Sequence, residues 1–146
     1  MSAGGHNDVI NGVSFDGNQI AIFLTGTSGA NIQNNMIVDN QIGLAAHSAM
    51  KTTFKENVLN KNDLAGVTLV NSKDNVIDTN IIKESRNGVF NDAQSTGNQI
   101  TTNTVMDNSG VDLNNGNGLP INVNDATFTQ NLCQTSVPDG LCTAGQ

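Results

Sequence analysis

A pattern that returns every 22 or 23 residues constrains this chain more than any other feature of its sequence. The asparagines Asn35, Asn57, Asn80 and Asn103 stand at equivalent places in successive repeats, at spacings of 22, 23 and 23 residues. A small residue before an aliphatic one recurs at Ala21, Gly43, Gly66, Gly88 and Gly110. Self-similarity at a fixed period of this length is typical of a solenoid, in which each repeat stacks on its neighbours.

Each repeat consists of short pieces in which apolar and polar side chains alternate, separated by Asn, Asp and Gly. In 66–69, for example, alternation places Val67 and Leu69 inward and Thr68 outward. No segment shows a sustained helical stripe, and the L-x-x-L-x-L ladder of leucine-rich repeats is absent. The sequence therefore predicts an all-β chain, a parallel β-helix of about six coils of 22–23 residues.

Stacked coils place equivalent side chains directly above one another, about 4.8 Å apart. Three inward columns follow from the spacing: Ile10, Ile32, Phe54, Ile77, Ile100 and Val123; Phe15, Ile37, Leu59, Ile82, Val105 and Phe128; Ile22, Leu44, Val67, Val89 and Val111. Asn35, Asn57, Asn80 and Asn103 form a structural ladder in this interpretation, because an amide both donates and accepts along the axis. Asn also tolerates the left-handed backbone of a sharp corner. Asn18, Asn40, Asn62, Ser85 and Asn108 form a second ladder of the same kind.

The composition of the chain restricts which partners such a solenoid can bind. The formal net charge is −7 and the six basic residues are scattered, which argues against nucleic-acid binding. No apolar run approaches the roughly 20 residues that span a bilayer. The chain has 24 Asn but no Trp or Tyr, as expected for a narrow lumen rather than a broad globular core.

The two ends of the predicted solenoid differ. At the C-terminal end the repeat breaks, so we expect coils over 1–131 and a capping segment over 132–146. Cys133 and Cys142 flank a Pro-Asp-Gly turn there and could form a disulfide, which implies an oxidising compartment; two reduced thiols are the alternative. At the N-terminal end nothing helical covers the first coil. We expect this chain either to be the C-terminal part of a longer β-helix or to self-associate through that end.

The repeated Ile-x-x-Asn-x-Ile/Val, followed by Asn and by Gly-Val or Gly-Ile, resembles the repeats of pectin-lyase-like proteins. This resemblance covers roughly residues 8–131 and implies a right-handed, single-stranded parallel β-helix. The superfamily includes pectate lyases, alginate epimerases, phage tailspikes and periplasmic copper-pathway proteins. It implies a secreted or periplasmic location, with the signal peptide outside this sequence, and association with polysaccharide.

The residues that catalysis needs on this fold are scarce. The resemblance implies clustered Asp for calcium with an Arg or Lys base, or a Tyr/His pair, yet the chain has no Tyr and one Arg. Lys61 interrupts the one acidic column, Asp39, Glu84 and Asp107, which disfavours calcium. His6 and His47 lack a third ligand at metal spacing. We therefore assign no catalytic residue, no metal ligand and no cofactor, and whether the chain is an enzyme stays open, with the balance against it.

One outer face could bind a ligand. Alternation places Thr68, Phe90 and Asp112 in an outward column, with His47 and Asp92 beside it around the next bend. These five residues could form a shallow sugar-binding surface; the alternative is ordinary exposed apolar surface, or a face covered by another segment.

Three hypotheses for function remain. The first is a polysaccharide-associated module, which could belong to a lyase- or epimerase-like secreted protein. The second is a non-catalytic structural or assembly scaffold, or the C-terminal fragment of a longer β-helix. The third, a periplasmic protein of the copper-pathway type, predicts stabilisation by metal.

Overall fold

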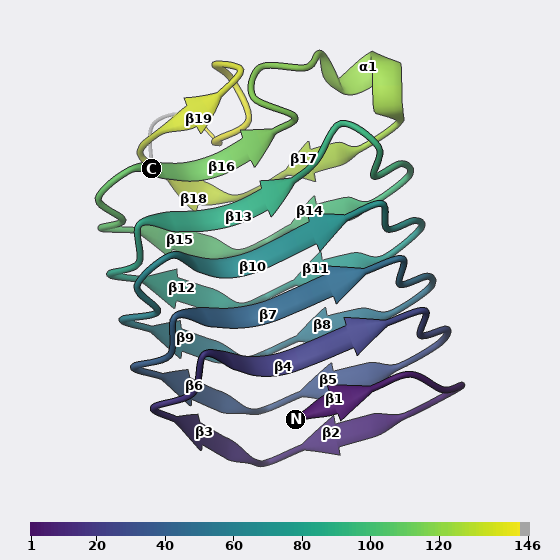
Figure 1. Ribbon diagram of the computed structural model, residues 1–146. Coiled ribbons are helices and arrows are strands. Elements are labelled where there is room, and N and C mark those ends of the chain that lie inside the picture. Colours follow the sequence, from purple (N-terminus) through teal and green to yellow (C-terminus); the bar gives the residue numbers. More distant parts are fainter. Residues whose placement is uncertain (144–146) are drawn as a thin grey trace.

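The computed structural model describes residues 1–143 and is a parallel β-solenoid, as the sequence predicts. Figure 1 shows the coils stacked along one axis, with the N-terminal strand at one end and a short helix at the other. Three parallel sheets run the length of the stack; one has seven strands and the other two have six each. The only helix over the described residues is α1, Ile121–Asn124. The prediction of an all-β fold is confirmed.

The sheets are named here by their strand at the N-terminal end. The β1 sheet contains β1 (Ser2–Ala3), β4 (Ile20–Thr25), β7 (Ile42–His47), β10 (Ala65–Val70), β13 (Asn87–Asn91), β16 (Val111–Asn115) and β19 (Ser136–Val137). The β2 sheet contains β2 (Val9–Asn11), β5 (Asn31–Gln33), β8 (Thr53–Lys55), β11 (Val76–Asp78), β14 (Gln99–Thr101) and β17 (Thr127–Thr129). The β3 sheet contains β3 (Ser14–Asp16), β6 (Met36–Val38), β9 (Val58–Asn60), β12 (Ile81–Lys83), β15 (Thr104–Met106) and β18 (Leu132–Cys133).

Strand register stacks equivalent side chains and fills the lumen with aliphatic columns. Ile10 pairs with Ile32, Ile32 with Phe54, and the same column continues through Ile77 and Ile100. The second and third predicted columns are also found over most of their length, and their central members are fully buried. Burial of each such side chain stabilises the fold by about 1.5–3 kcal/mol. These columns are the hydrophobic core.

The predicted asparagine ladders run along two corners of the solenoid. The backbone N–H and the Nδ2 of Asn35 both donate to Oδ1 of Asn57, each at 2.9 Å. Asn57 donates in the same way to Asn80, and Asn80 to Asn103. The second ladder runs Asn18, Asn40, Asn62, Ser85 and Asn108. All these bonds have one polarity, because the donor lies one coil nearer the N-terminus than the acceptor.

A third corner carries a ladder that sequence analysis did not predict. The backbone N–H of Thr52 donates to Oδ1 of Asn75, and that of Asn75 donates to Oδ1 of Asn98. Nδ2 of Asn98 then donates to Asn91 at 2.9 Å, and Asn91 donates to Asn115. This ladder was missed because Ala30 and Thr52 occupy its earlier positions, so no run of asparagines marks it in the sequence.

The left-handed backbone of the corners lies one residue before each ladder asparagine, which corrects the expectation that the asparagines adopt it themselves. Positive φ angles occur at Asn34, Glu56, Thr79 and Thr102, and at Asp39, Lys61, Glu84 and Asp107. For residues other than Gly this conformation costs about 1–2 kcal/mol each. The ladder bonds beside each corner offset that cost. The acidic column of Asp39, Glu84 and Asp107 consists of such corner residues.

The last coil departs from the predicted register. Phe128, not Val123, follows Ile100 in the first column, and Cys133, not Phe128, follows Val105 in the second. In the third column Leu113 takes the place predicted for Val111. The first two columns shift because of an excursion over 116–126, which contains α1 and leaves Val123 64% exposed. The third column shifts earlier, before β16.

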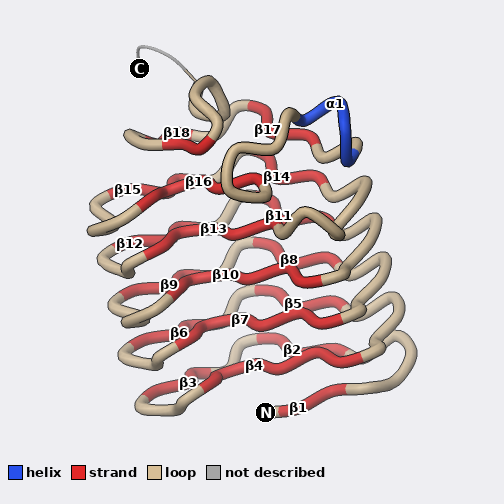
Figure 2. The backbone as a smooth tube through the Cα atoms, turned by 45° about the horizontal axis from the view of Figure 1, so that its top comes forward, coloured by secondary structure: helices blue, strands red, loops and turns tan. Residues whose placement is uncertain are grey.

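The C-terminal segment is closed by a disulfide between Cys133 and Cys142, as the sequence suggested. Strands β18 and β19 add one strand each to the β3 and β1 sheets, and Leu141 is buried against the core. Figure 2 shows this segment and the excursion at the same end of the stack. The predicted division into coils over 1–131 and a cap over 132–146 stays a prediction, and residues 144–146 lie outside the described part.

Candidate functional site

A groove of about 340 Å³ lies on the outer face of the β1 sheet. Its lining comes from β7, β10, β13 and β16, the residues next to them, and the excursion: Ile42, Leu64, Ala65, Thr68, Asn87, Phe90, Asn114 and Asn117. The lining thus spans four successive coils along the solenoid axis. Pockets that bind small ligands typically begin at roughly this volume.

Strand register explains why these side chains share one face. Thr68 pairs with Phe90, and Phe90 with Asn114, so the three form one outward column. Gly88 and Val89 both face the lumen, since a Cβ at Gly88 would contact Val105. Because Gly88 and Val89 both face inward, the residues on either side of them, Asn87 and Phe90, both face outward.

Two of the five predicted site residues, Thr68 and Phe90, lie in this groove. His47 lies outside it, exposed, with its ring edge-on to Phe23 at a centroid distance of 5.1 Å. Asp92 is half-buried at a bend, where its Oδ1 accepts from Oγ of Ser95 at 2.7 Å and from N–H of Asn71 at 3.1 Å. Through these bonds Asp92 links two successive coils at a corner of the solenoid.

The predicted outward orientation of Asp112 is wrong. Its side chain is only 1% exposed and stands beneath the last coil, in register with Gly88. The carboxylate accepts from Nδ2 of Asn108 at 2.7 Å and from N–H of Gln134 and Thr135 at 2.8 and 3.0 Å. The error came from aligning Gly110 with Gly88; Asn114 occupies the outward place beside Phe90 instead.

Six groove residues lie outside the predicted site: Ile42, Leu64, Ala65, Asn87, Asn114 and Asn117. Strict alternation placed Gly88 outward and Asn87 inward, which hid Asn87. Asn117 belongs to the excursion that interrupts the repeat, so no register position could predict it. A longer interval between the last two coils was the available signal, because insertions in solenoids often map to the binding face.

The groove combines an apolar floor with amide walls and carries no charge. Leu64 is 46% exposed beside Phe90, and none of the eight lining residues is acidic or basic. Nδ2 of Asn87 makes a 3.3 Å bond to the carbonyl of Leu64, which leaves its Oδ1 without a partner among residues 1–143. Asn117 accepts from Nδ2 of Asn114 at 3.3 Å and keeps its own Nδ2 free within that range. The walls thus offer both a donor and an acceptor.

Metal ligands do not converge in the part of the chain that the structure describes. No group of three or more His, Cys, Asp or Glu residues there could hold an ion. Nζ of Lys55 lies 3.7 Å from the carboxylate of Asp78 in a partly exposed ion pair, and surface pairs of this kind contribute little to stability. Calcium favours several converging oxygen ligands, and no group of three or more acidic side chains supplies them in that part of the chain.

Comparison with known proteins places the chain in a family. A family model described as periplasmic copper-binding protein (NosD) matches residues 2–143. The chain belongs to the NosD family. No curated protein and no solved structure matches it.

The NosD family is a periplasmic parallel β-helix family of the pectin-lyase-like type, so the predicted resemblance is confirmed. The predicted secreted or periplasmic location agrees with it, and the disulfide suits an oxidising compartment. Among the described residues no helix has the length and apolar character needed to cross a bilayer.

The description of the NosD family implies copper. Copper favours imidazole, thiolate and thioether ligands. Cys133 and Cys142 are joined to each other, and the ring of His47 lies edge-on to Phe23. His6 and Met50 lie in one column, separated by the intervening coil at Ser28. The described residues therefore do not fit a copper ion, while the expectation that no cofactor is needed stays a prediction.

Proposed function

We propose that this NosD-family chain is a saccharide-binding module that holds a short stretch of neutral glycan in the groove of the β1 sheet. The observation that carries the proposal is the half-buried ring of Phe90 and the exposed side chain of Leu64, which lie between the amides of Asn87, Asn114 and Asn117. A sugar ring has apolar C–H faces and a rim of hydroxyls, and this lining offers a complement to both. Such sites combine apolar surface with a few placed polar groups.

The absence of charged side chains in the groove favours neutral saccharides over charged ones. A uronate or a phosphorylated sugar would need a cation or several N–H donors in the site, since an unpaired charge at a partly dry surface is costly. The lining has amides and one hydroxyl, that of Thr68, which is committed to the carbonyl of Leu44 at 3.4 Å. Neutral hexose chains are therefore the proposed ligand class.

The proposal is binding without bond cleavage. Lyases and epimerases abstract a proton and need a positioned acid or base. None of the eight groove residues titrates near neutral pH. A role as part of a larger lyase- or epimerase-like protein would then require the catalytic groups to come from elsewhere.

A glycan array of neutral and uronate oligosaccharides, followed by calorimetry on any neutral glycan that binds, tests this function. The variant Phe90→Ala should weaken binding about tenfold or more, because an aromatic platform contributes roughly 0.5–1.5 kcal/mol beyond its buried area. Phe23→Ala is the matched control, since Phe23 lies in the same outward column but outside the groove. Binding unaffected by Phe90→Ala, or no neutral glycan bound, would overturn the proposal.

A separate assay addresses cleavage. Polygalacturonate and alginate are incubated with the protein while the absorbance of unsaturated uronates is followed. We expect no increase over buffer. A steady increase that depends on protein concentration would show lyase activity and refute binding without cleavage.

We propose assembly as a second role, favoured by a specific observation at the N-terminal end. Strands β2 and β3 each have a neighbour on one side only, and the lumen beneath them is open among the described residues. Unpaired strand edges are templates for pairing with another chain. In this role the first coil is the surface through which two copies of the chain meet.

A further inference from the structure

Four Asn-Gly pairs occur in the chain: Asn11–Gly12, Asn87–Gly88, Asn115–Gly116 and Asn117–Gly118. In such a pair the backbone nitrogen of the glycine can attack the side-chain carbonyl carbon of the asparagine, because glycine has no Cβ to obstruct the approach. The reaction replaces the amide by a carboxylate, and it requires the local backbone to open. The surroundings of each pair therefore decide which of the four reacts.

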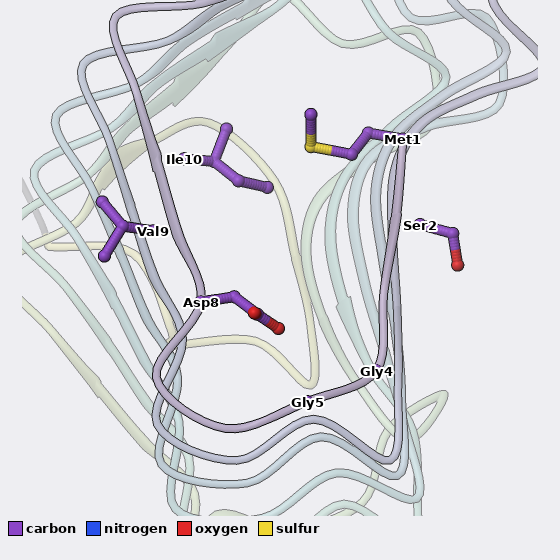
Figure 3. A pocket seen from close by; sticks show the side chains of 7 residues that line it. All are labelled: Met1, Ser2, Gly4, Gly5, Asp8, Val9 and Ile10. Carbon is purple, nitrogen blue, oxygen red and sulfur yellow. The ribbon is translucent and has the colours of Figure 1, made fainter.

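The first pair is held between two coils. Asn11 is exposed at the end of β2 and pairs with Gln33 of the next coil. It follows Ile10, whose side chain is directed into the lumen (Figure 3). The N–H of Gly12 donates to the carbonyl of Gln33 at 3.3 Å. Attack by this nitrogen requires the first coil to separate locally from the second.

The next two pairs are held more firmly. Asn87 and Gly88 lie within β13, which is paired with a strand on each side. Asn115 is fully buried, and the N–H of Gly116 donates to the carbonyl of Asn91 in the preceding coil at 2.7 Å. Attack in either pair requires the loss of bonds between coils.

The pair Asn117–Gly118 lies in the turn that follows β16, and both residues are exposed. The N–H of Gly118 donates to the carbonyl of Asn115 at 3.0 Å. Within residues 1–143 the hydrogen bonds of this pair go to Asn114 and Asn115, the two residues just before Gly116. This turn can therefore open without breaking a hydrogen bond to a neighbouring coil.

A neighbouring amide activates the side chain of Asn117. Nδ2 of Asn114 donates to Oδ1 of Asn117 at 3.3 Å, while Oδ1 of Asn114 accepts from N–H of Asn117 at 2.8 Å. The first bond is directed to the oxygen that becomes negatively charged when the nitrogen of Gly118 adds to Cγ. A donor placed at developing negative charge lowers the barrier of such a step.

We propose that Asn117 is a site of spontaneous deamidation, assisted by the amide of Asn114. The nitrogen of Gly118 forms a bond to Cγ of Asn117, and the bond from Cγ to Nδ2 breaks. The proton that the nitrogen loses leaves with the released ammonia. One water molecule then opens the cyclic imide at either carbonyl, which gives an aspartate or an isoaspartate. Water is the only co-reactant.

The product changes the groove, because Asn117 is part of its lining. A carboxylate there removes the free Nδ2 donor and places a charge among eight lining residues that otherwise carry none. This consequence rests on the proposed function, whereas the modification itself does not require a glycan. Affinity for a neutral glycan should fall about threefold or more on deamidation, as expected for the loss of one donor.

Peptide mapping by mass spectrometry, on protein kept warm at slightly alkaline pH and sampled over time, tests the site. We expect deamidation at Asn117 to be about tenfold faster than at Asn11, since only the turn must open. Asn87 and Asn115 should stay intact over the same period. Deamidation at Asn11 that equals or exceeds that at Asn117 would refute the site.

Two variants test the assistance by Asn114. Asn114→Asp keeps an acceptor for the N–H of Asn117 but removes the donor to Oδ1, so deamidation at Asn117 should slow about threefold. Asn31→Asp is the matched control, because Asn31 is exposed on β5 and its variant makes the same change in net charge. Circular dichroism checks that both variants are folded. An unchanged rate in Asn114→Asp, or an equal decrease in Asn31→Asp, would refute the assistance.

Calorimetry with a neutral glycan that binds compares the wild type with Asn117→Asp. Weaker binding by the variant supports the consequence for the groove, and unchanged affinity overturns it. If no neutral glycan binds, the proposed function fails, while the mapping still decides whether Asn117 is the deamidation site.

Discussion

Asp112 and Asp8 are carboxylates that face the lumen at opposite ends of the solenoid, and their surroundings differ completely. Asp112 receives three donors, from Asn108, Gln134 and Thr135. Asp8 has a buried oxygen without any. The same residue type therefore binds the last coil to the C-terminal segment at one end, and keeps a buried oxygen without a donor in the first coil. The comparison shows that a carboxylate in a β-solenoid acts through the donors around it.

The two ends also differ in how the chain closes them. At the C-terminal end, the disulfide, the buried side chain of Leu141 and the excursion over 116–126 cover the last coil. Solenoids need their terminal repeats capped, because each repeat buries its apolar face only against a neighbour. The first coil has no such closure among residues 1–143. We expect the last coil to be more stable than the first one.

The largest expected effect is at Asp112. Replacing Asp112 with Ala leaves two backbone N–H groups and the amide of Asn108 without their acceptor, and should lower the free energy of unfolding by about 4 kcal/mol. Asp139→Ala, in the exposed turn of the same segment, should change it by less than about 0.5 kcal/mol. Urea unfolding followed by circular dichroism measures both. Equal effects of the two variants would show that the cap does not depend on Asp112.

Replacing a ladder asparagine in the middle of the stack should lower the free energy of unfolding more than replacing one in the first coil. Asn57 accepts two bonds and donates to Asn80, Ile32 and Lys55, so Asn57→Ala should cost about 3 kcal/mol. Asn18 in the first coil is exposed and shares fewer bonds, so Asn18→Ala should cost about 1 kcal/mol. Thermal unfolding compares the two. A larger loss at Asn18 would contradict the predicted gradient.

Removing the disulfide should weaken the capped end selectively. Replacing Cys133 and Cys142 with Ser opens a short loop, and loop-closure entropy predicts a loss of about 2–3 kcal/mol. The wild type in reducing buffer should behave like the double variant. Limited proteolysis should then cut within 132–143 before it cuts the first coil, whereas unchanged cleavage would mean that packing alone holds the cap.

The smallest expected effect is at Asp8. Asp8→Ala removes a buried oxygen that has no partner, so at low protein concentration the free energy of unfolding should rise or stay within about 0.5 kcal/mol. Urea unfolding of the monomer measures it. A loss comparable to that of Asp112→Ala would mean that Asp8 has a structural partner in solution.

The period of the repeat was enough to predict the fold, the aliphatic columns and the ladder of Asn35, Asn57, Asn80 and Asn103, because each depends on spacing alone. The pairing of Cys133 with Cys142 was also predicted correctly, because only a short segment with a turn separates them. The candidate site was predicted only at Thr68 and Phe90. Asp112 was misplaced because the register shifts before β16, and Asn87 was missed because Gly88 and Val89 both face inward. Neither shift leaves a mark in the local alternation.

Backbone hydrogen exchange, resolved strand by strand on the monomer, tests the contrast between the ends most directly, because protection reports local opening free energy. We expect amides of β2 and β3 to exchange much faster than those of β17 and β18, with the strands of the middle coils slowest of all. Equal protection of the first and last coils, or faster exchange at the disulfide-closed end, would contradict the account.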